Sequence, residues 1–185
     1  VYRDPDEPVN QMNTTLGYDV PIPIYHTISN GIDTETYCVD PGLYYAGNGY
    51  YTVNRYIDPR TDAPLDKAVA AAVYEMHNRR ENGLDDTSYT AVGQIVMRWI
   101  FRQYNDGGNF VKDGYMTDGV YLEKSWIAFG NPDYATALNN NSAIVTIAKE
   151  VYSKAMEASR ISYNQAVEQN LIYNPRLTAK YKEVI

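Results

Sequence analysis

The stretch Thr90-Ala91-Val92-Gly93-Gln94-Ile95-Val96-Met97-Arg98-Trp99 decides the fold predicted for this chain. Its apolar side chains recur at intervals of three and four, which is typical of a helix that buries one face. The expected core residues of this helix are Val92, Ile95, Val96, Trp99 and Ile100. Gln94 lies in the middle of the pattern, where a glutamine is usually a hydrogen-bonded core amide. It takes another role only if a reactive partner lies beside it.

A second helix is predicted before this one, and the two are expected to form an αα-hairpin. It begins near Pro64, because proline is favoured in the first turn of a helix, and it stops at Asn82-Gly83. Its apolar face is predicted to hold Val69, Ala72, Val73 and Met76. Thr87 or Ser88 is expected to cap the central helix, which then ends near 105–108.

The longest helix is predicted from a cap at 139–142 to about Asn170. Its apolar stripe comprises Ile144, Ile147, Val151, Ala155, Ala158 and Ile161. A short helix is expected over 122–129. Earlier in the chain, the alternation typical of strands predicts strands over 14–20, 22–28, 34–39 and 50–53, with a turn at Ser29-Asn30-Gly31.

Strands followed by helices predict an α+β fold. The length suits a single domain, 1–185, with approximately 1–60 as the β-rich part and 61–172 as the mostly helical part. A returning strand over 173–185 is left open.

The composition disfavours two kinds of partner. The formal net charge of −7 argues against a nucleic-acid backbone. No apolar run approaches the roughly 20 residues that a membrane span needs, so membrane insertion is not expected. The 19 tyrosines, against 3 phenylalanines, suit a half-exposed recognition surface. The sequence begins at Val1 without a charged and apolar leader, so we expect a mature or excised domain.

Cys38, in Tyr37-Cys38-Val39-Asp40-Pro41, is the only cysteine of the 185 residues, so it cannot form an internal disulfide. Its value lies in packing or in reactivity, and an inert buried thiol is the commoner case. The predicted elements place Cys38 at a strand end and Gln94 in the central helix. A thiolate can attack the Gln94 carboxamide and expel ammonia. The resulting thioester would join the two predicted parts of the fold.

The Cys38 and Gln94 segments together resemble the thioester domains of surface adhesins of Gram-positive bacteria. That family carries a Tyr-Cys-hydrophobic-acidic sequence in its N-terminal third and Thr-Gln-x-Ala-Ile/Val-Trp on a helix. Here the first is Tyr37-Cys38-Val39-Asp40 and the second is Gly93-Gln94-Ile95-Val96-Met97-Arg98-Trp99. Gly93 stands where the family has Thr, Val96 stands where it has Ala, and Trp99 comes one position late.

The resemblance implies a β-sandwich or barrel packed against an α-helical bundle, with a Cys38–Gln94 thioester at the interface. It implies an extracellular adhesion module on the bacterial cell surface, within a longer cell-wall-anchored protein. The partner would be a host surface or extracellular-matrix protein, whose lysine amine displaces the thiol and forms an amide with Gln94. The domain would be monomeric and would need neither cofactor nor metal. It would act once without turnover, so it is not expected to be an enzyme.

Two other functions fit the same residues. A cysteine acyltransferase or hydrolase would use Cys38 as nucleophile and His26 or His77 as base, and turnover of an amide substrate would reveal it. A non-covalent binding module would use the tyrosine-rich surface, with Cys38 buried or in a purely structural cross-link. A detectable thiol in the native protein would favour an unlinked Cys38. The Asp and Gly residues over 106–119 match no calcium-ligand spacing and are interpreted as a solvated loop.

Overall fold

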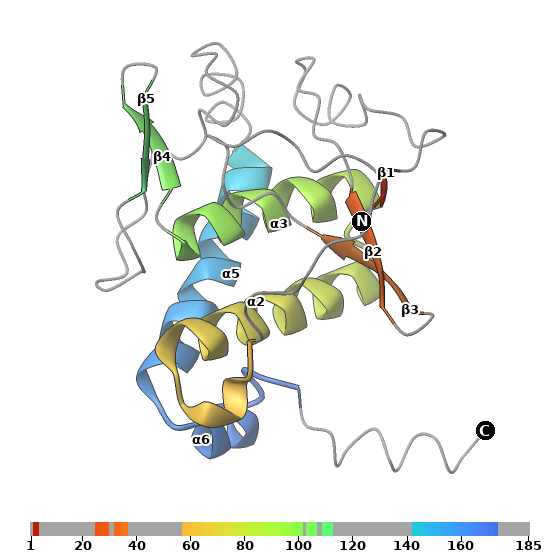
Figure 1. Ribbon diagram of the computed structural model, residues 1–185. Coiled ribbons are helices and arrows are strands. Elements are labelled where there is room, and N and C mark those ends of the chain that lie inside the picture. The colour runs from red at the N-terminus through yellow and green to blue at the C-terminus, as the bar shows by residue number, and fades with distance from the viewer. Residues whose placement is uncertain are drawn as a thin grey trace, which may run out of the picture.

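The computed structural model describes residues 2–3, 25–29, 32–36, 57–101, 103–106, 109–112 and 142–173, whose arrangement Figure 1 shows. Their long helices are α2 (Pro64–Glu81), α3 (Asp86–Ile100) and α5 (Ser142–Arg160). A 3-10 helix, η1 (Pro59–Thr61), precedes α2, and a short helix, α6 (Tyr163–Glu168), follows α5. Each of the three long helices packs against the other two.

The described strands form two small antiparallel ladders. β1 (Tyr2–Arg3), β2 (Tyr25–Ser29) and β3 (Ile32–Thr36) form a sheet in that order. In its register Tyr2 lies opposite His26, and Ser29 lies opposite Ile32. β4 (Gln103–Asp106) and β5 (Asn109–Lys112) form a hairpin soon after α3, with Asp106 opposite Asn109.

The predicted α+β fold, with a β-sandwich or barrel beside a helical bundle, is wrong, because the described part of the chain is predominantly helical. A sandwich needs two sheets packed face to face, and a barrel needs a closed sheet. The described strands form one open three-stranded ladder and one hairpin. Alternation of polar and apolar residues indicates local extended backbone, but it does not determine whether strands assemble into a large sheet. Within the described residues there is therefore no sandwich or barrel that could form the expected interface with the helices.

Several predicted elements lie outside the described residues. These are the strands over 14–20 and 50–53, the short helix over 122–129 and the returning strand after 173.

α2 begins and ends where the sequence predicts. Pro64 and Asp66 lie in its first turn and Arg79 in its last, which suits the helix dipole at both ends. Gly83 has a φ of +100°, a left-handed conformation that glycine adopts without strain. The Leu84 N–H donates a hydrogen bond to the Arg79 carbonyl at 2.9 Å, which closes the end of the helix. The chain then reverses, and α3 packs against α2 as the predicted αα-hairpin.

Both ends of α3 differ from the prediction. The N-cap is Asp85, not Thr87 or Ser88: its carboxylate accepts hydrogen bonds from the Ser88 N–H at 2.9 Å and the Ser88 hydroxyl at 2.7 Å. A carboxylate both caps the free amides and interacts favourably with the helix dipole, so it prevails over a hydroxyl. α3 ends at Ile100, not near 105, and β4 begins soon after it. The Gly107-Gly108 dipeptide after β4 is typical of tight hairpins.

The predicted single helix to Asn170 is broken into α5 and α6 by a new N-cap at Ser162. The Ser162 hydroxyl accepts a hydrogen bond from the Gln165 N–H, and the Gln165 side chain accepts one from the Ser162 N–H at 3.0 Å. This capping box satisfies amides that a continuous helix would have paired with carbonyls, so a fresh helix starts here. Asn170, with a φ of +57°, follows the end of α6.

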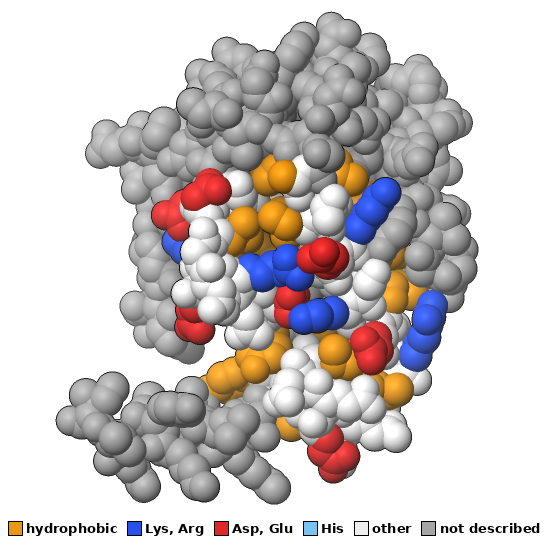
Figure 2. All heavy atoms as spheres, turned by 180° about the vertical axis from the view of Figure 1, so that it is seen from behind, with side chains coloured by type: hydrophobic (Ala, Val, Ile, Leu, Met, Phe, Trp, Pro, Cys, Tyr) orange, Lys and Arg blue, Asp and Glu red, His pale blue; other side chains and the backbone are white. Residues whose placement is uncertain are grey.

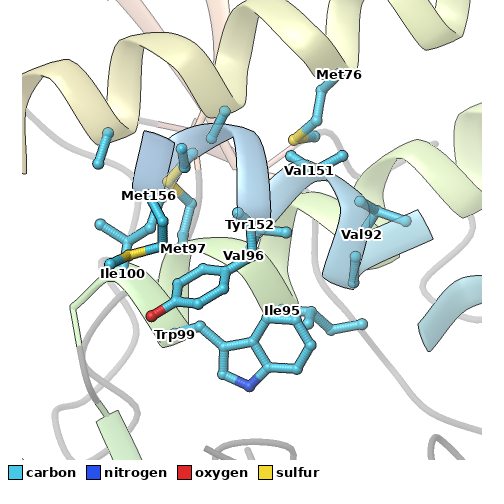
Figure 3. Packing of buried hydrophobic residues seen from close by; sticks show 14 of the residues in the cluster. Met76, Val92, Ile95, Val96, Met97, Trp99, Ile100, Val151, Tyr152 and Met156 are labelled. Atoms are coloured by element: carbon cyan, nitrogen blue, oxygen red, sulfur yellow. The ribbon is translucent and has the colours of Figure 1, made fainter. Parts of the chain in front are cut away.

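The core lies between α2, α3 and α5, and Figure 3 shows its centre. The core residues predicted for α3 are confirmed as buried: Val92, Ile95, Val96, Trp99 and Ile100. Trp99 lies edge-to-face against Tyr152 of α5, with ring centroids 5.5 Å apart. On α2, Ala72 and Met76 are buried as predicted, but Val73 is 36% exposed, so its predicted place in the core is wrong.

Candidate functional site

Gln94 lies on a buried polar stripe of α3. Thr90, Gln94 and Arg98 follow one another at intervals of four residues, so they share one face of the helix and lie one turn apart. Thr90 is 8% exposed, Gln94 5% and Arg98 2%. We call these three residues the α3 polar stripe. The apolar residues of the helix lie in the core, so α3 is buried on its polar side as well as on its apolar side.

A polar stripe that is closed to water must find its hydrogen-bonding partners inside the protein, because an unsatisfied buried amide or guanidinium is costly. Gln94 and Arg98 both have interaction partners in the structure. Two nitrogens of the Arg98 guanidinium, Nε and Nη1, are nevertheless buried without a hydrogen-bond partner, so the hydrogen-bonding groups of the stripe are only partly satisfied.

Arg98 brings a permanent positive charge to this environment, because a guanidinium stays protonated in proteins. Side chains four residues apart on a helix are neighbours, with about 5–6 Å between their Cβ atoms. A charge acts more strongly on a nearby dipole in a buried, low-dielectric site than it does in water. A cation beside a carboxamide draws electron density toward its oxygen and makes its carbon more electrophilic. The stripe thus places a carboxamide and a guanidinium one turn apart on the same buried face of α3.

The other half of the predicted pair, Cys38, lies outside the described residues, as do Tyr37, Val39 and Asp40. β3 ends at Thr36, two residues before Cys38 in the sequence. The pairing of Cys38 with Gln94 stays a prediction.

The two histidines considered as bases lie on different elements. His77 is exposed on α2, and its ring centroid is 6.0 Å from that of Tyr89 on α3. His26 lies in β2, opposite Tyr2 on one side and Glu35 on the other. His77 thus lies near a tyrosine at the start of α3, and a role for either histidine as the base for Cys38 stays a prediction.

A second polar cluster, which the sequence analysis missed, joins α2 to α5. Its centre is Glu75, whose side chain is only 10% exposed. One oxygen of Glu75 accepts from Arg79 Nε at 2.7 Å, and the other accepts from Lys154 Nζ at 2.5 Å. Arg79 Nη2 also binds a carboxylate oxygen of Glu150 at 2.8 Å. We call these four residues the α2–α5 ion cluster.

The ion cluster changes the titration of its arginine. Burial of Arg79 would lower the pKa of its guanidinium, but hydrogen bonds with Glu75 and Glu150 outweigh it and raise the pKa above its usual value. Arg79 therefore remains charged throughout the accessible pH range. The four-residue spacings of Glu75 and Arg79 on α2 and of Glu150 and Lys154 on α5 were the only signs of the cluster in the sequence, since the two pairs lie far apart along the chain.

A buried lysine connects the start of α2 with the end of α5. Lys67 Nζ donates a hydrogen bond to the Ile161 carbonyl, just after α5 ends, and lies 3.9 Å from a carboxylate oxygen of Asp62. A cation at the C-terminal end of a helix interacts favourably with the helix dipole. Asp62 also accepts a hydrogen bond from the Tyr163 N–H at the start of α6. These contacts hold the helices together and suggest no chemistry.

Comparison with models of protein families, with curated proteins and with solved structures finds no match. Within the described residues, no group of three or more His, Cys, Asp or Glu side chains is placed to hold a metal ion. No helix in the described part of the chain is long and apolar enough to cross a membrane.

Proposed function

We propose that this chain is a covalent adhesion module in which the Cys38 thiol and the Gln94 carboxamide form an internal thioester. The observation that carries the proposal is the position of Gln94, buried on the α3 polar stripe one turn from the equally buried Arg98. A buried acyl group is shielded from water, which would otherwise hydrolyse a thioester before a partner arrives. The resemblance of the Cys38 and Gln94 segments to adhesin thioester domains supports the same function.

Formation of the bond is an intramolecular acyl transfer. Cys38 Sγ attacks Gln94 Cδ, the Cδ–Nε2 bond breaks, and ammonia leaves with the proton that the thiol gives up. Amides are poor acyl donors, so the fold must supply proximity, and well-oriented pairs reach effective molarities of about 10⁵–10⁸ M. The charge of Arg98 would stabilise the negative charge that develops on Gln94 Oε1. It would also favour the thiolate form of a cysteine brought to the same place.

The thioester would then react with a host surface or extracellular-matrix protein. An unprotonated lysine amine attacks Gln94 Cδ, the Cδ–Sγ bond breaks, and the Cys38 thiol is regenerated beside a stable amide. The reaction runs in this direction because a thiol, with a pKa near 8.5, is a better leaving group than an amine whose conjugate acid has a pKa near 10.4. Each molecule reacts once. Such a module would act outside the cell, on the bacterial surface, within a longer cell-wall-anchored protein.

The first experiment is the intact mass of the native protein. A protein that contains the thioester is lighter than its sequence by one ammonia, and Cys38→Ala and Gln94→Ala should each restore the calculated mass. A wild-type mass equal to the sequence mass, with a thiol that reacts freely after unfolding, would rule out the thioester.

The second experiment asks whether the bond is an adhesive group or a structural cross-link. Methylamine should add to Gln94 and release the Cys38 thiol, at a rate that rises with pH because only the unprotonated amine attacks. Candidate host proteins should form conjugates that survive denaturing gels with wild type and not with Cys38→Ala. A thioester that is present by mass but inert to methylamine would be a structural cross-link, and the adhesion proposal would fail.

A further inference from the structure

The turn that joins α2 to α3 contains a chemically reactive pair of residues. Asn82 is the C-cap of α2, Gly83 follows it, and both are exposed. In an Asn-Gly pair the backbone nitrogen of the glycine can attack the carboxamide of the asparagine, because glycine has no side chain to hinder the approach. A Cβ added at Gly83 would meet nothing within 4 Å. The surroundings of this pair are therefore open, and only local hydrogen bonds can hold the two groups apart.

The folded turn engages the attacking nitrogen in a Schellman closure of α2. The Gly83 N–H donates a hydrogen bond to the Arg80 carbonyl at 3.1 Å, and the Leu84 N–H donates one to the Arg79 carbonyl at 2.9 Å. The Leu84 side chain packs against the main apolar core, which is the hydrophobic contact that often accompanies this closure. Attack on a carboxamide thus requires the Gly83 nitrogen to leave its bond with Arg80.

The carboxamide under attack is also held away from the reactive geometry. Asn82 Nδ2 donates a hydrogen bond to the Asn78 carbonyl at 2.6 Å, one turn back along the helix. The ψ angle of Asn82 is 18°. Closure of a five-membered ring between the side chain and the next backbone nitrogen needs a large rotation about this bond. The turn must therefore open before the two groups can react.

We propose that Asn82 is a modification site, which deamidates through a succinimide at a rate that the Schellman closure controls. The Gly83 nitrogen bonds to Asn82 Cγ, the Cγ–Nδ2 bond breaks, and ammonia leaves with the proton of the Gly83 N–H. Water then adds to one of the two imide carbonyls and cleaves the ring. The product at position 82 is aspartate or isoaspartate, according to which carbonyl is attacked.

The two products differ in what they do to the turn. Aspartate adds one negative charge, and on the face of the molecule in Figure 2 acidic and basic side chains of the described helices are already interspersed. One more exposed carboxylate is therefore expected to change little. Isoaspartate carries the chain through its side-chain carbon and lengthens the backbone by one atom, so the closure cannot re-form in the same register. Once isoaspartate has formed, the end of α2 should stay open.

The imide has a consequence for the mass of the protein. Like the proposed Cys38–Gln94 thioester, it lacks one ammonia, so the two species have the same intact mass. They differ in the thiol, which the imide leaves free, and in the products of hydrolysis, because the hydrolysed imide is one dalton heavier than the sequence. Deamidation of Asn82 does not rest on the adhesion chemistry, and it should proceed equally in Cys38→Ala.

The test compares the native full chain with the chain unfolded in guanidinium chloride, both at mildly alkaline pH, by peptide mapping of aspartate and isoaspartate at position 82. The native rate should be lower by about ten- to a hundredfold, the factor for losing two ordinary hydrogen bonds. Asn30-Gly31 and Asn48-Gly49 have the same reactive pair, so in the unfolded chain they should react about as fast as Asn82. Equal native and unfolded rates at Asn82, or no reaction there in the unfolded chain while the other two pairs react, would overturn the proposal.

A matched pair of variants separates opening of the turn from unfolding of the whole protein. Leu84→Ala removes the apolar contact of the closure and keeps the Asn82-Gly83 pair, so the native rate should rise several-fold and the rate in guanidinium chloride should stay the same. Val167→Ala removes part of a side chain of α6 that packs against a separate apolar cluster, and it should leave the native rate at Asn82 unchanged. Equal acceleration by both variants, or none by Leu84→Ala, would overturn control by the closure.

Discussion

The α3 polar stripe and the α2–α5 ion cluster both contain an arginine, but they place it in opposite surroundings. Arg98 is 2% exposed, whereas the Arg79 side chain is 26% exposed and one of its two partners, Glu150, is 53% exposed. A buried charge acts strongly on its neighbours and is costly unless its surroundings are arranged for it. A partly exposed charge can exchange its partner for water or for a ligand. The first arrangement fixes a charge inside the protein, and the second leaves a charge that water and salt can reach.

The largest expected effect is that of removing the buried charge. Arg98→Ala should destabilise the protein by about 3–5 kcal/mol, because the groups that now surround the guanidinium would stay buried without it. Arg79→Ala should cost clearly less, since its partner Glu150 is exposed to water. Urea denaturation of the two variants beside wild type measures the difference. Equal losses of unfolding free energy would show that the two arginines are not in different electrostatic environments.

The second prediction concerns the cross-link. A thioester between positions 38 and 94 closes a loop of 56 residues, and the chain-entropy model gives at most roughly 4 kcal/mol for such a loop. Cys38→Ala should therefore lower the melting temperature and leave the helical fold intact, because α2, α3 and α5 share an apolar core of their own.

A double-mutant cycle separates the cross-link from ordinary packing of the two side chains. If the bond exists, the double variant Cys38→Ala/Gln94→Ala should lose much less than the sum of the two single variants, since either change alone already removes the bond. Additive losses would mean that Cys38 and Gln94 are not linked. Far-ultraviolet circular dichroism of each variant checks that the helices remain.

The third prediction addresses the ion cluster. Glu75→Ala should cost about 1–2 kcal/mol, because its oxygens serve two cations but both cations can regain water. Their side chains are 26% exposed in Arg79 and 45% in Lys154. Sodium chloride at 1 M should reduce the difference between wild type and Glu75→Ala, and it should change the effect of Arg98→Ala much less. An equal salt response of the two variants would contradict the contrast in burial.

The sequence predicts the helices far better than the strands. The apolar faces of α2, α3 and α5 follow from periodicity, because a helix that buries one side needs that spacing. Helix boundaries were predicted wrongly where a local hydrogen bond decides them, as at the Asp85 N-cap of α3 and at the Ser162 capping box that separates α6 from α5. The sandwich or barrel was wrong because it came from a resemblance carried by two short segments, and large sheets depend on pairings between distant residues.

Only part of the candidate site could likewise be predicted from the sequence. The helical position of Gln94 follows from the sequence, and its burial agrees with the prediction that it lies within a core helix. Arg98 was not singled out, although its four-residue separation from Gln94 is visible in the sequence. A charged residue among apolar ones is normally assigned to the surface, and only the packing around α3 shows that this one is buried. The ion cluster depends on α2 and α5 lying side by side, which no local pattern reveals.

The smallest effect is expected at Asp58 and Arg60 beside η1, two residues apart in the sequence, where the Arg60 side chain is 68% exposed. Both Asp58 oxygens accept hydrogen bonds from the Arg60 side chain at 2.8 Å. This side-chain hydrogen bonding with Arg60 lowers the pKa of the Asp58 carboxyl. A carboxyl whose pKa is lower in the folded state stabilises that state above its unfolded pKa, and the contribution is lost as the pH falls through the folded pKa. The carboxyl carbon of Asp58 should therefore titrate below the usual range for aspartate in NMR, and Arg60→Gln should return the midpoint to that range. The unfolding free energy at neutral pH should be nearly the same in Arg60→Gln and wild type, because water and salt screen an exposed pair. If Arg60→Gln lowered the free energy of unfolding as much as Glu75→Ala does, burial would not decide how much these charges contribute to stability.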